Sequence, residues 1–217
     1  MKSLLTKYLL RLYCLCTCLY SYSQDSTNVA GLFEGKVTYV HQILNPNKGL
    51  ISDEEFFRDL PNAGKSIVTL YIKSNQYKWE YEDRIEYYYP KNQQIVIVSK
   101  RLQDSIYVTS ATLVEEKVEK LIKSNLTKRL LGYSLSAQEI HTKWDTKTFF
   151  YSPLALKTNA TFWRQHKYNY LSEMTGTAKA FPMIIHNQSL LGNWIMAVSK
   201  IEPMLLDETY FALPSSK

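Results

Sequence analysis

The stretch SIVTLYIKSNQYKWEYEDRIEYYYPKNQQIVIVSK, residues 66–100, decides the fold. Apolar and polar residues alternate in it with a period of two, with a break at residues 74–76. This period is typical of strands that pack one side on apolar surface and expose the other to water. Pro90 ends the longest run because proline has no N–H to donate to a ladder, and residues 94–99 follow as a further strand. Strands separated by so few residues pair as neighbours, since a parallel connection needs a crossover of about a dozen residues. The stretch therefore predicts an antiparallel meander.

Five aromatic residues of this stretch are the candidate binding residues. Continuous alternation places them on one side of the strands: Tyr77, Trp79, Tyr81, Tyr87 and Tyr89. Such a face can line a concave sheet that holds an apolar ligand, because aromatic rings offer a large contact area. It can equally be the core beneath a covering helix. Both interpretations stay open from the sequence.

An acidic group lies beside these aromatic residues. Glu80, Glu82, Asp83 and Glu86 could supply paired carboxylates for glycoside chemistry. Their alternation with Lys78 and Arg84 instead favours a solvated side of the sheet with cross-strand charge pairs. We therefore expect no catalytic residue here.

The rest of the chain continues the β pattern. Further strands are predicted at residues 33–44, 106–109, 128–140, 143–151, 180–186 and 193–201, with Gly132 as a site for a bulge or close approach. Residues 112–124 fit either a helical face or a strand from Val118 onward. Residues 155–172 are predicted to form a loop or short helix over the sheet, and a capping box at Ser52 predicts a helix or turn-rich lid of about two turns. The fold class is mainly β (α+β): a curved antiparallel sheet or half-barrel with one or two short covering helices.

The first residues read as a leader. A basic start, a short apolar run and small residues at Ser21 and Ser23 predict a secretory signal peptide at 1–23, with a single β-rich domain at 24–217. A membrane anchor is the alternative, but the uncharged run is shorter than the roughly 20 residues that span a bilayer. A third interpretation is a lipobox in which Cys18 is lipidated. All three cysteines lie in this leader, so the mature chain would have neither a disulfide nor a thiol nucleophile.

Charge and motifs exclude several function classes. The formal charge of +6 falls to +3 when Lys2, Lys7 and Arg11 leave with the leader, and the lysines are not clustered. We therefore expect no nucleic-acid partner. Four scattered histidines, His41, His141, His166 and His186, lack the spacing of a preformed metal site. No nucleophile elbow, phosphate loop or dinucleotide fingerprint occurs, so we expect no metal, no cofactor and no enzyme.

Several short motifs resemble a known group of proteins. They are FEGKVTY at 33–39, the tyrosine-rich meander, RLLGY at 129–133, YSPL at 151–154 and YFALP at 210–214. Together they resemble secreted, largely uncharacterised envelope domains of Bacteroidetes, which are similar in layout to the periplasmic lipoprotein carriers of the Lol type. Many such domains carry a cysteine soon after the Leu-Gly-Tyr element, and this chain has none at residues 134–136.

The resemblance implies a curved antiparallel sheet, partly covered by helices, that holds acyl chains. We expect a non-enzymatic exported protein of the cell envelope, in the periplasm or associated with the outer membrane, that binds an apolar or lipid-like ligand. Its partners would be a lipid or lipoprotein, an envelope protein or a membrane surface. The alternative is a structural or interaction module with a solid core and no small ligand. A hydrolase would need two or more carboxylates or histidines that converge in one cleft.

Overall fold

The computed structural model describes residues 31–44, 66–102, 105–114, 116–189 and 192–213, which belong to one compact unit. The predicted signal peptide at 1–23, the start of the predicted domain at residue 24 and the predicted helix at Ser52 lie outside these residues. Those expectations remain predictions.

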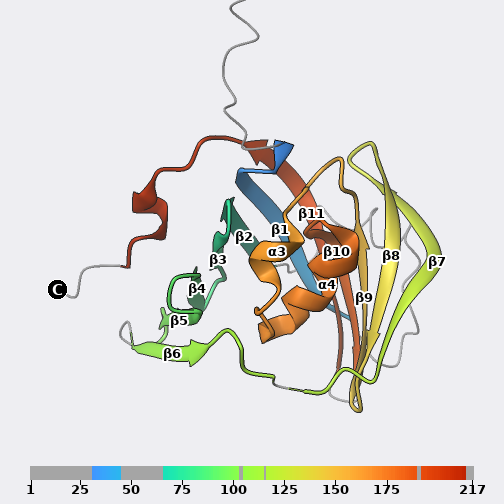
Figure 1. Ribbon diagram of the computed structural model, residues 1–217, viewed down its shortest axis with the longest axis horizontal. Coiled ribbons are helices and arrows are strands. Elements are labelled where there is room, and N and C mark those ends of the chain that lie inside the picture. The colour runs from blue at the N-terminus through green and yellow to red at the C-terminus, as the bar shows by residue number, and fades with distance from the viewer. Residues whose placement is uncertain (1–30, 45–65, 103–104, 115, 190–191, 214–217) are drawn as a thin grey trace, which may run out of the picture. The chain divides into compact units, whose positions relative to one another are not determined.

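Within the described residues, eleven strands form one antiparallel sheet of order β6-β5-β4-β3-β2-β1-β11-β10-β9-β8-β7 (Figure 1). The first meander consists of β1 (Gly35–Leu44), β2 (Ser66–Lys73), β3 (Gln76–Glu80), β4 (Arg84–Tyr89), β5 (Gln94–Ser99) and β6 (Ile106–Ser110). The second consists of β7 (Lys120–Leu130), β8 (Tyr133–His141), β9 (Asp145–Tyr151), β10 (Pro182–Ser189) and β11 (Gly192–Pro203). Because β1 pairs with β11, the two meanders form one sheet. The sheet is not closed, since β6 and β7 remain its edges.

Two short helices cover one face of this sheet. Figure 1 shows α3 (Ala160–Trp163) and α4 (Leu171–Ala178) between β3–β5 on one side and β8–β9 on the other. A 3-10 turn, η2 (Tyr168–Tyr170), leads into α4. The buried residues of α4 include Leu171, Met174 and Ala178, which are spaced by three and four residues as one helix face requires. The mainly β class with a curved antiparallel sheet and two short covering helices is therefore confirmed.

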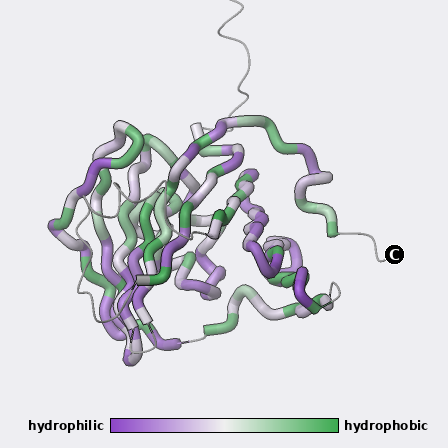
Figure 2. Tube along the Cα trace, turned by 180° about the vertical axis from the view of Figure 1, so that it is seen from behind, coloured by the Kyte–Doolittle hydropathy of each residue, from purple (hydrophilic) through white to green (hydrophobic). Residues whose placement is uncertain are grey.

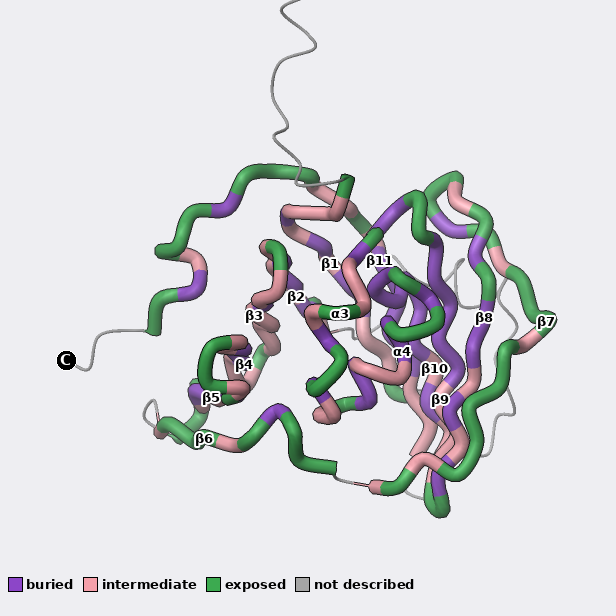
Figure 3. The backbone as a smooth tube through the Cα atoms, in the orientation of Figure 1, coloured by how far each residue is buried: buried purple, intermediate pink, exposed green. Residues whose placement is uncertain are grey.

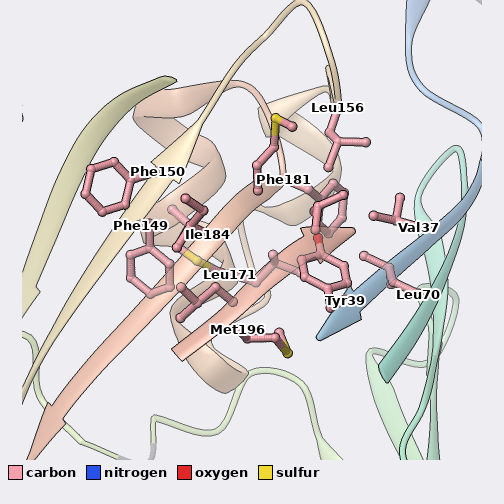
Figure 4. Close-up of a cluster of buried hydrophobic side chains, with 14 of the residues drawn as sticks. Val37, Tyr39, Leu70, Phe149, Phe150, Leu156, Leu171, Phe181, Ile184 and Met196 are labelled. Atoms are coloured by element: carbon pink, nitrogen blue, oxygen red, sulfur yellow. The ribbon is translucent and has the colours of Figure 1, made fainter. Parts of the chain in front are cut away.

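The main core lies between the middle strands and these helices. Figure 3 shows the buried residues concentrated on the middle strands and α4, whereas the edge strand β7 is largely exposed. Figure 2 shows hydrophilic and hydrophobic residues alternating along the strands, as expected for a sheet with one face in the core. Figure 4 shows side chains that meet there from β1, β2, β11 and α4, among them Tyr39, Leu70, Met196 and Leu171.

Two details differ from the predicted strand boundaries. The strand expected at 128–140 is a hairpin, in which Leu131 and Gly132 form the turn with φ of 50° and 82°. Gly132 is therefore a turn residue and not a bulge, because two consecutive positive φ values are what a tight primed hairpin turn needs. In residues 112–124, the described part adopts the strand alternative from Lys120 onward.

The C-terminal segment lies against the other face of the first meander. In η3 (Glu208–Phe211), Glu208 Oε1 accepts from Lys73 Nζ at 2.7 Å, and the Tyr210 ring lies 5.4 Å from the Tyr71 ring. We call the face that carries α3 and α4 the helix side of the sheet and the opposite one the outer face.

Candidate ligand-binding cavity

Three of the predicted aromatic residues line a cavity on the helix side. Tyr77, Trp79 and Tyr81 all contribute to its wall. The Trp79 ring centroid lies 5.2 Å from that of Tyr39 and 6.0 Å from that of Tyr81. Burial raises the pKa of Tyr77 and of Tyr81 well above the ordinary value, so both hydroxyls stay neutral. Tyr39, Trp79 and Tyr81 thus form a run of neighbouring rings, and the Tyr77 ring contacts Tyr88, Trp163 and His166 instead.

The other two predicted residues, Tyr87 and Tyr89, lie on the outer face. Tyr87 packs in a separate apolar cluster with Val96 and Val98, and the Tyr89 hydroxyl donates to Phe211 O at 2.8 Å. The expected single face of five aromatic rings is therefore divided into three and two.

The register of β3 and β4 explains this division. Trp79 pairs with Glu86, and Lys78 pairs with Tyr87. Directly paired residues of an antiparallel sheet project to the same side. The residues that face the helix side are therefore odd-numbered in β3 and even-numbered in β4. In β4 the side chains on the helix side are Arg84, Glu86 and Tyr88, and not the odd-numbered tyrosines that continuous alternation predicts.

Glu86 was expected on the solvated side, and this expectation is wrong. The residue is only 1% exposed. Its Oε1 lies 2.6 Å from Arg84 Nε, and the Arg84 Cζ lies 4.0 Å from the centre of the Tyr81 ring. Removing a carboxylate from water costs several kcal/mol, so a carboxylate is buried only when a charged or hydrogen-bonding partner accompanies it. The number of turn residues between β3 and β4 is the sequence signal that could have indicated this change from odd to even residues on the helix side.

One end of the helix side is filled by aromatic residues. Trp163 of α3 is fully buried and donates from Nε1 to Thr158 Oγ1 at 2.7 Å. His166 lies 3.0 Å through Nε2 from the Tyr77 hydroxyl, and its ring meets the Tyr88 ring edge-on at 4.5 Å. Burial lowers the pKa of His166 to about 4, so the imidazole is neutral near pH 7.

The neighbouring part of the helix side is hollow, with a cavity of about 570 Å³. Its interior consists of buried apolar side chains, chiefly Val68, Phe149, Met174, Phe181, Ile185 and Met196. The exposed residues of its lining mark the mouth: Ile43, Glu82, Arg101 and Asn169. The size falls within the roughly 300–1,000 Å³ of small-molecule sites.

The segment that borders this cavity has an unusual backbone. Asn169 and Tyr170 are consecutive residues with φ of 52° and 59°. A non-glycine residue in this region costs on the order of 1–3 kcal/mol. Tyr170 is held by Lys147, whose Nζ lies 4.6 Å from its ring centre, and α4 is held by Gln138, whose Nε2 donates to Glu173 O at 3.0 Å. Contacts to β8 and β9 thus fix the border of the cavity.

The cavity lining brings together two histidines, His41 and His166, and two carboxylates, Glu82 and Asp83, which is the convergence that a hydrolase would need. Ser66 Oγ lies 3.2 Å from His41 Nδ1. Burial, followed by the Arg84 charge, lowers the pKa of His41. Among the described residues no carboxylate hydrogen-bonds His41, and no group of three metal-ligating side chains is present. In the same part of the chain, no helix is long and apolar enough to cross a bilayer.

Comparisons with known proteins give limited matches. No protein-family model and no curated protein matches the sequence. Two solved structures of PNGF-II, in space groups P21 and C2, have TM-scores of 0.46 and 0.48 at 11% and 12% sequence identity. The matches cover 83% and 82% of this chain but only 30% and 29% of the PNGF-II chains. The resemblance to Lol-type carriers remains a prediction from the sequence.

Proposed function

We propose that this chain is a non-enzymatic, exported protein of the cell envelope that binds an apolar or lipid-like ligand in the cavity. The observation that carries this proposal is the apolar hollow of about 570 Å³ beneath α4. Export follows from the predicted leader at residues 1–23. The Bacteroidetes-type resemblance supports the periplasm or the outer membrane as its location.

The size of the cavity favours a ligand over a solid interaction module. Unfilled apolar volume destabilises a core by about 24 cal/mol per Å³. For 570 Å³ this gives about 14 kcal/mol as an upper bound, because the mouth opens to water. Whole domains are stable by only about 5–15 kcal/mol. The hollow therefore favours a protein that fills it with a ligand over a module with a solid core.

The surroundings of His41 support a binding role over serine-hydrolase chemistry. A serine hydrolase needs a base that takes the serine proton and a carboxylate that orients this base. His41 has Arg84 as its charged neighbour instead, which disfavours the imidazolium that the reaction forms. Turnover of a nitrophenyl ester that disappears in the Ser66→Ala variant would contradict the non-enzymatic proposal.

Binding of an acyl probe tests the proposed function. A fluorescent fatty acid is titrated into the wild type, Trp79→Ala and Trp144→Ala. Trp144 is a matched control because it is 57% exposed and does not line the cavity. We expect Trp79→Ala to weaken binding about tenfold or more, the effect of losing one large apolar contact, and Trp144→Ala to leave it unchanged. An absence of probe binding at every concentration would overturn the proposal.

Native mass spectrometry of the protein purified from its own envelope is an independent measurement. A retained adduct of lipid size would support the proposal. A bare mass combined with no binding of the acyl probe would favour the interaction module, and a diacylated Cys18 would place the cleavage site elsewhere.

A further inference from the structure

We infer that the ligand is a single-chain amphiphile whose anionic head group, a carboxylate or phosphate, binds Arg84 and Arg101 at the mouth of the cavity. This inference rests on the proposed function, since it assigns an orientation and a head group to the ligand of that cavity.

The tyrosine hydroxyls of the interior have partners within the protein. The Tyr39 hydroxyl donates to Pro182 O at 2.8 Å, and the Tyr77 hydroxyl lies 3.0 Å from His166 Nε2. A polar group of the ligand that bound either hydroxyl would displace its buried hydrogen bond; the one buried lining nitrogen without a partner among the described residues is His166 Nδ1. Buried polar groups that lose a partner cost about 1–3 kcal/mol each. The interior thus favours the hydrocarbon part of the ligand.

The cavity has room for a long hydrocarbon chain. At about 30 Å³ for a group the size of a water molecule or methylene, 570 Å³ holds roughly 19 such groups. One long chain is therefore the simplest apolar occupant of the hollow.

Arg84 is a preorganised donor at the mouth. Its Nε binds Glu86 at 2.6 Å, its Nη1 lies 3.3 Å from Asp83 Oδ1, and its plane lies over Tyr81. A guanidinium has five N–H donors in a fixed fork, so donors remain beyond these two contacts. Because the side chain is already held in place, a carboxylate or phosphate can bind it with little loss of side-chain entropy.

Backbone contacts place Arg101 at the same mouth. Lys100 N donates to Asp83 O at 2.8 Å, and Lys100 Nζ donates to Tyr81 O at 2.7 Å. These contacts fix the turn after β5 against the turn between β3 and β4. Arg101 follows directly, is exposed and lines the cavity. Among the described residues it makes no ion pair, so its guanidinium is available to an anion.

Among the described residues, the unpaired cation at the mouth is Arg101. Of the other two cations that line the cavity, Arg84 binds Glu86 and Asp83, and Lys147 Nζ lies 2.5 Å from Asp145 Oδ2. Asp83 already binds Arg84. Glu82 is exposed, so it can turn into water without cost. Arg101 therefore supplies the charge for the head group, and Arg84 supplies its remaining N–H donors.

Amphiphiles with the same 16-carbon chain and different head groups test the inference. Hexadecanoate, hexadecanol and hexadecylphosphocholine are titrated below their aggregation limits into the wild type, Arg101→Gln and Arg129→Gln, with inorganic phosphate as the head group alone. Arg129 is a matched control because it is an exposed arginine of β7 that does not line the cavity. Arg101→Gln avoids the fold risk of Arg84 variants, in which the buried Glu86 loses a partner.

We expect the wild type and Arg129→Gln to bind hexadecanoate about tenfold more tightly than hexadecanol, the equivalent of one charge-assisted contact. Arg101→Gln should lose this preference and keep its hexadecanol affinity.

Equal binding of acid and alcohol by the wild type would overturn the head-group inference and leave the proposed function intact. Tighter binding of the phosphocholine would overturn the anionic choice, and displacement of hexadecanoate by inorganic phosphate at equal concentration would overturn the amphiphile. Failure of all three amphiphiles to bind would overturn the proposed function itself.

Discussion

Replacement of His166 by glutamine should change how the stability of the protein depends on pH. The imidazole is 1% exposed, and burial lowers its pKa from 6.5 to about 4. Glutamine does not titrate and keeps a polar atom that can reach the Tyr77 hydroxyl. The lost histidine contacts change the free energy of unfolding by the same amount at every pH, whereas protonation of His166 changes it by an amount that depends on pH.

The sign follows from the two pKa values. Between pH 6.5 and about 4 the unfolded chain binds a proton at His166 and the folded chain does not. Lower pH therefore favours unfolding. The contribution of the neutral His166 to the free energy of unfolding is fully present above pH 6.5 and is lost as the pH falls toward 4. At about 1.4 kcal/mol per unit, the loss between pH 7.5 and 4.5 is on the order of 3 kcal/mol.

Urea denaturation of the wild type and His166→Gln at pH 7.5, 5.5 and 4.5 measures this loss. The free energy of unfolding of the wild type, relative to the variant, should fall by about 3 kcal/mol across the range. The control is His141→Gln, which removes a half-buried histidine of β8 that does not line the cavity. A difference between wild type and His166→Gln that stays constant from pH 7.5 to 4.5 would refute the burial argument.

Two further substitutions test the sheet. Arg84→Met removes the guanidinium from the buried Glu86 carboxylate, and we expect the free energy of unfolding in urea to fall by about 2–3 kcal/mol; an unchanged value would show that this ion pair does not stabilise the fold. Gly35→Ala would place a Cβ 2.3 Å from Glu202 O, whereas Gly192→Ala, at a similar φ, would meet no atom within 4 Å. Gly35→Ala should therefore lower Tm by about 2–4 °C more than the control for each kcal/mol of clash, and equal Tm values would contradict the close approach of β1 and β11.

Local pattern was sufficient to predict the meander and the two last strands. The strands of residues 66–99 are joined by short turns, so neighbouring pairing is forced by chain length. The same holds for β10 and β11, which pair from Ser189 and Gly192 onward. The pairing of β1 with β11 joins residues about 160 positions apart, and no local pattern indicates it. This one long-range pairing turns two meanders into a single curved sheet.

The candidate site was predicted in part because side-chain direction depends on turn length. Within β3 and the residue that follows it, a period of two suffices, and Tyr77, Trp79 and Tyr81 all line the cavity on the helix side. Beyond the turn the pairing of Trp79 with Glu86 shifts the helix side to even residues. Odd numbering then assigns Tyr87 to the wrong face. A strand pattern therefore gives sidedness only up to the next turn, and cross-strand register must supply the rest.

The position of the cavity follows from the lengths of its two layers. Eleven strands spaced about 4.8 Å apart make a sheet on the order of 50 Å wide along its curve. The eight residues of α4 extend only about 12 Å, and α3 is half as long. Such short helices cannot cover the whole concave face, so large side chains must complete the core. Trp163 and His166 do so beside Tyr77, and no residue of comparable size fills the hollow between Trp79 and Met196 among the described residues. A short roof over a wide curved sheet therefore leaves a space of ligand size, with Arg84 and Arg101 in its lining.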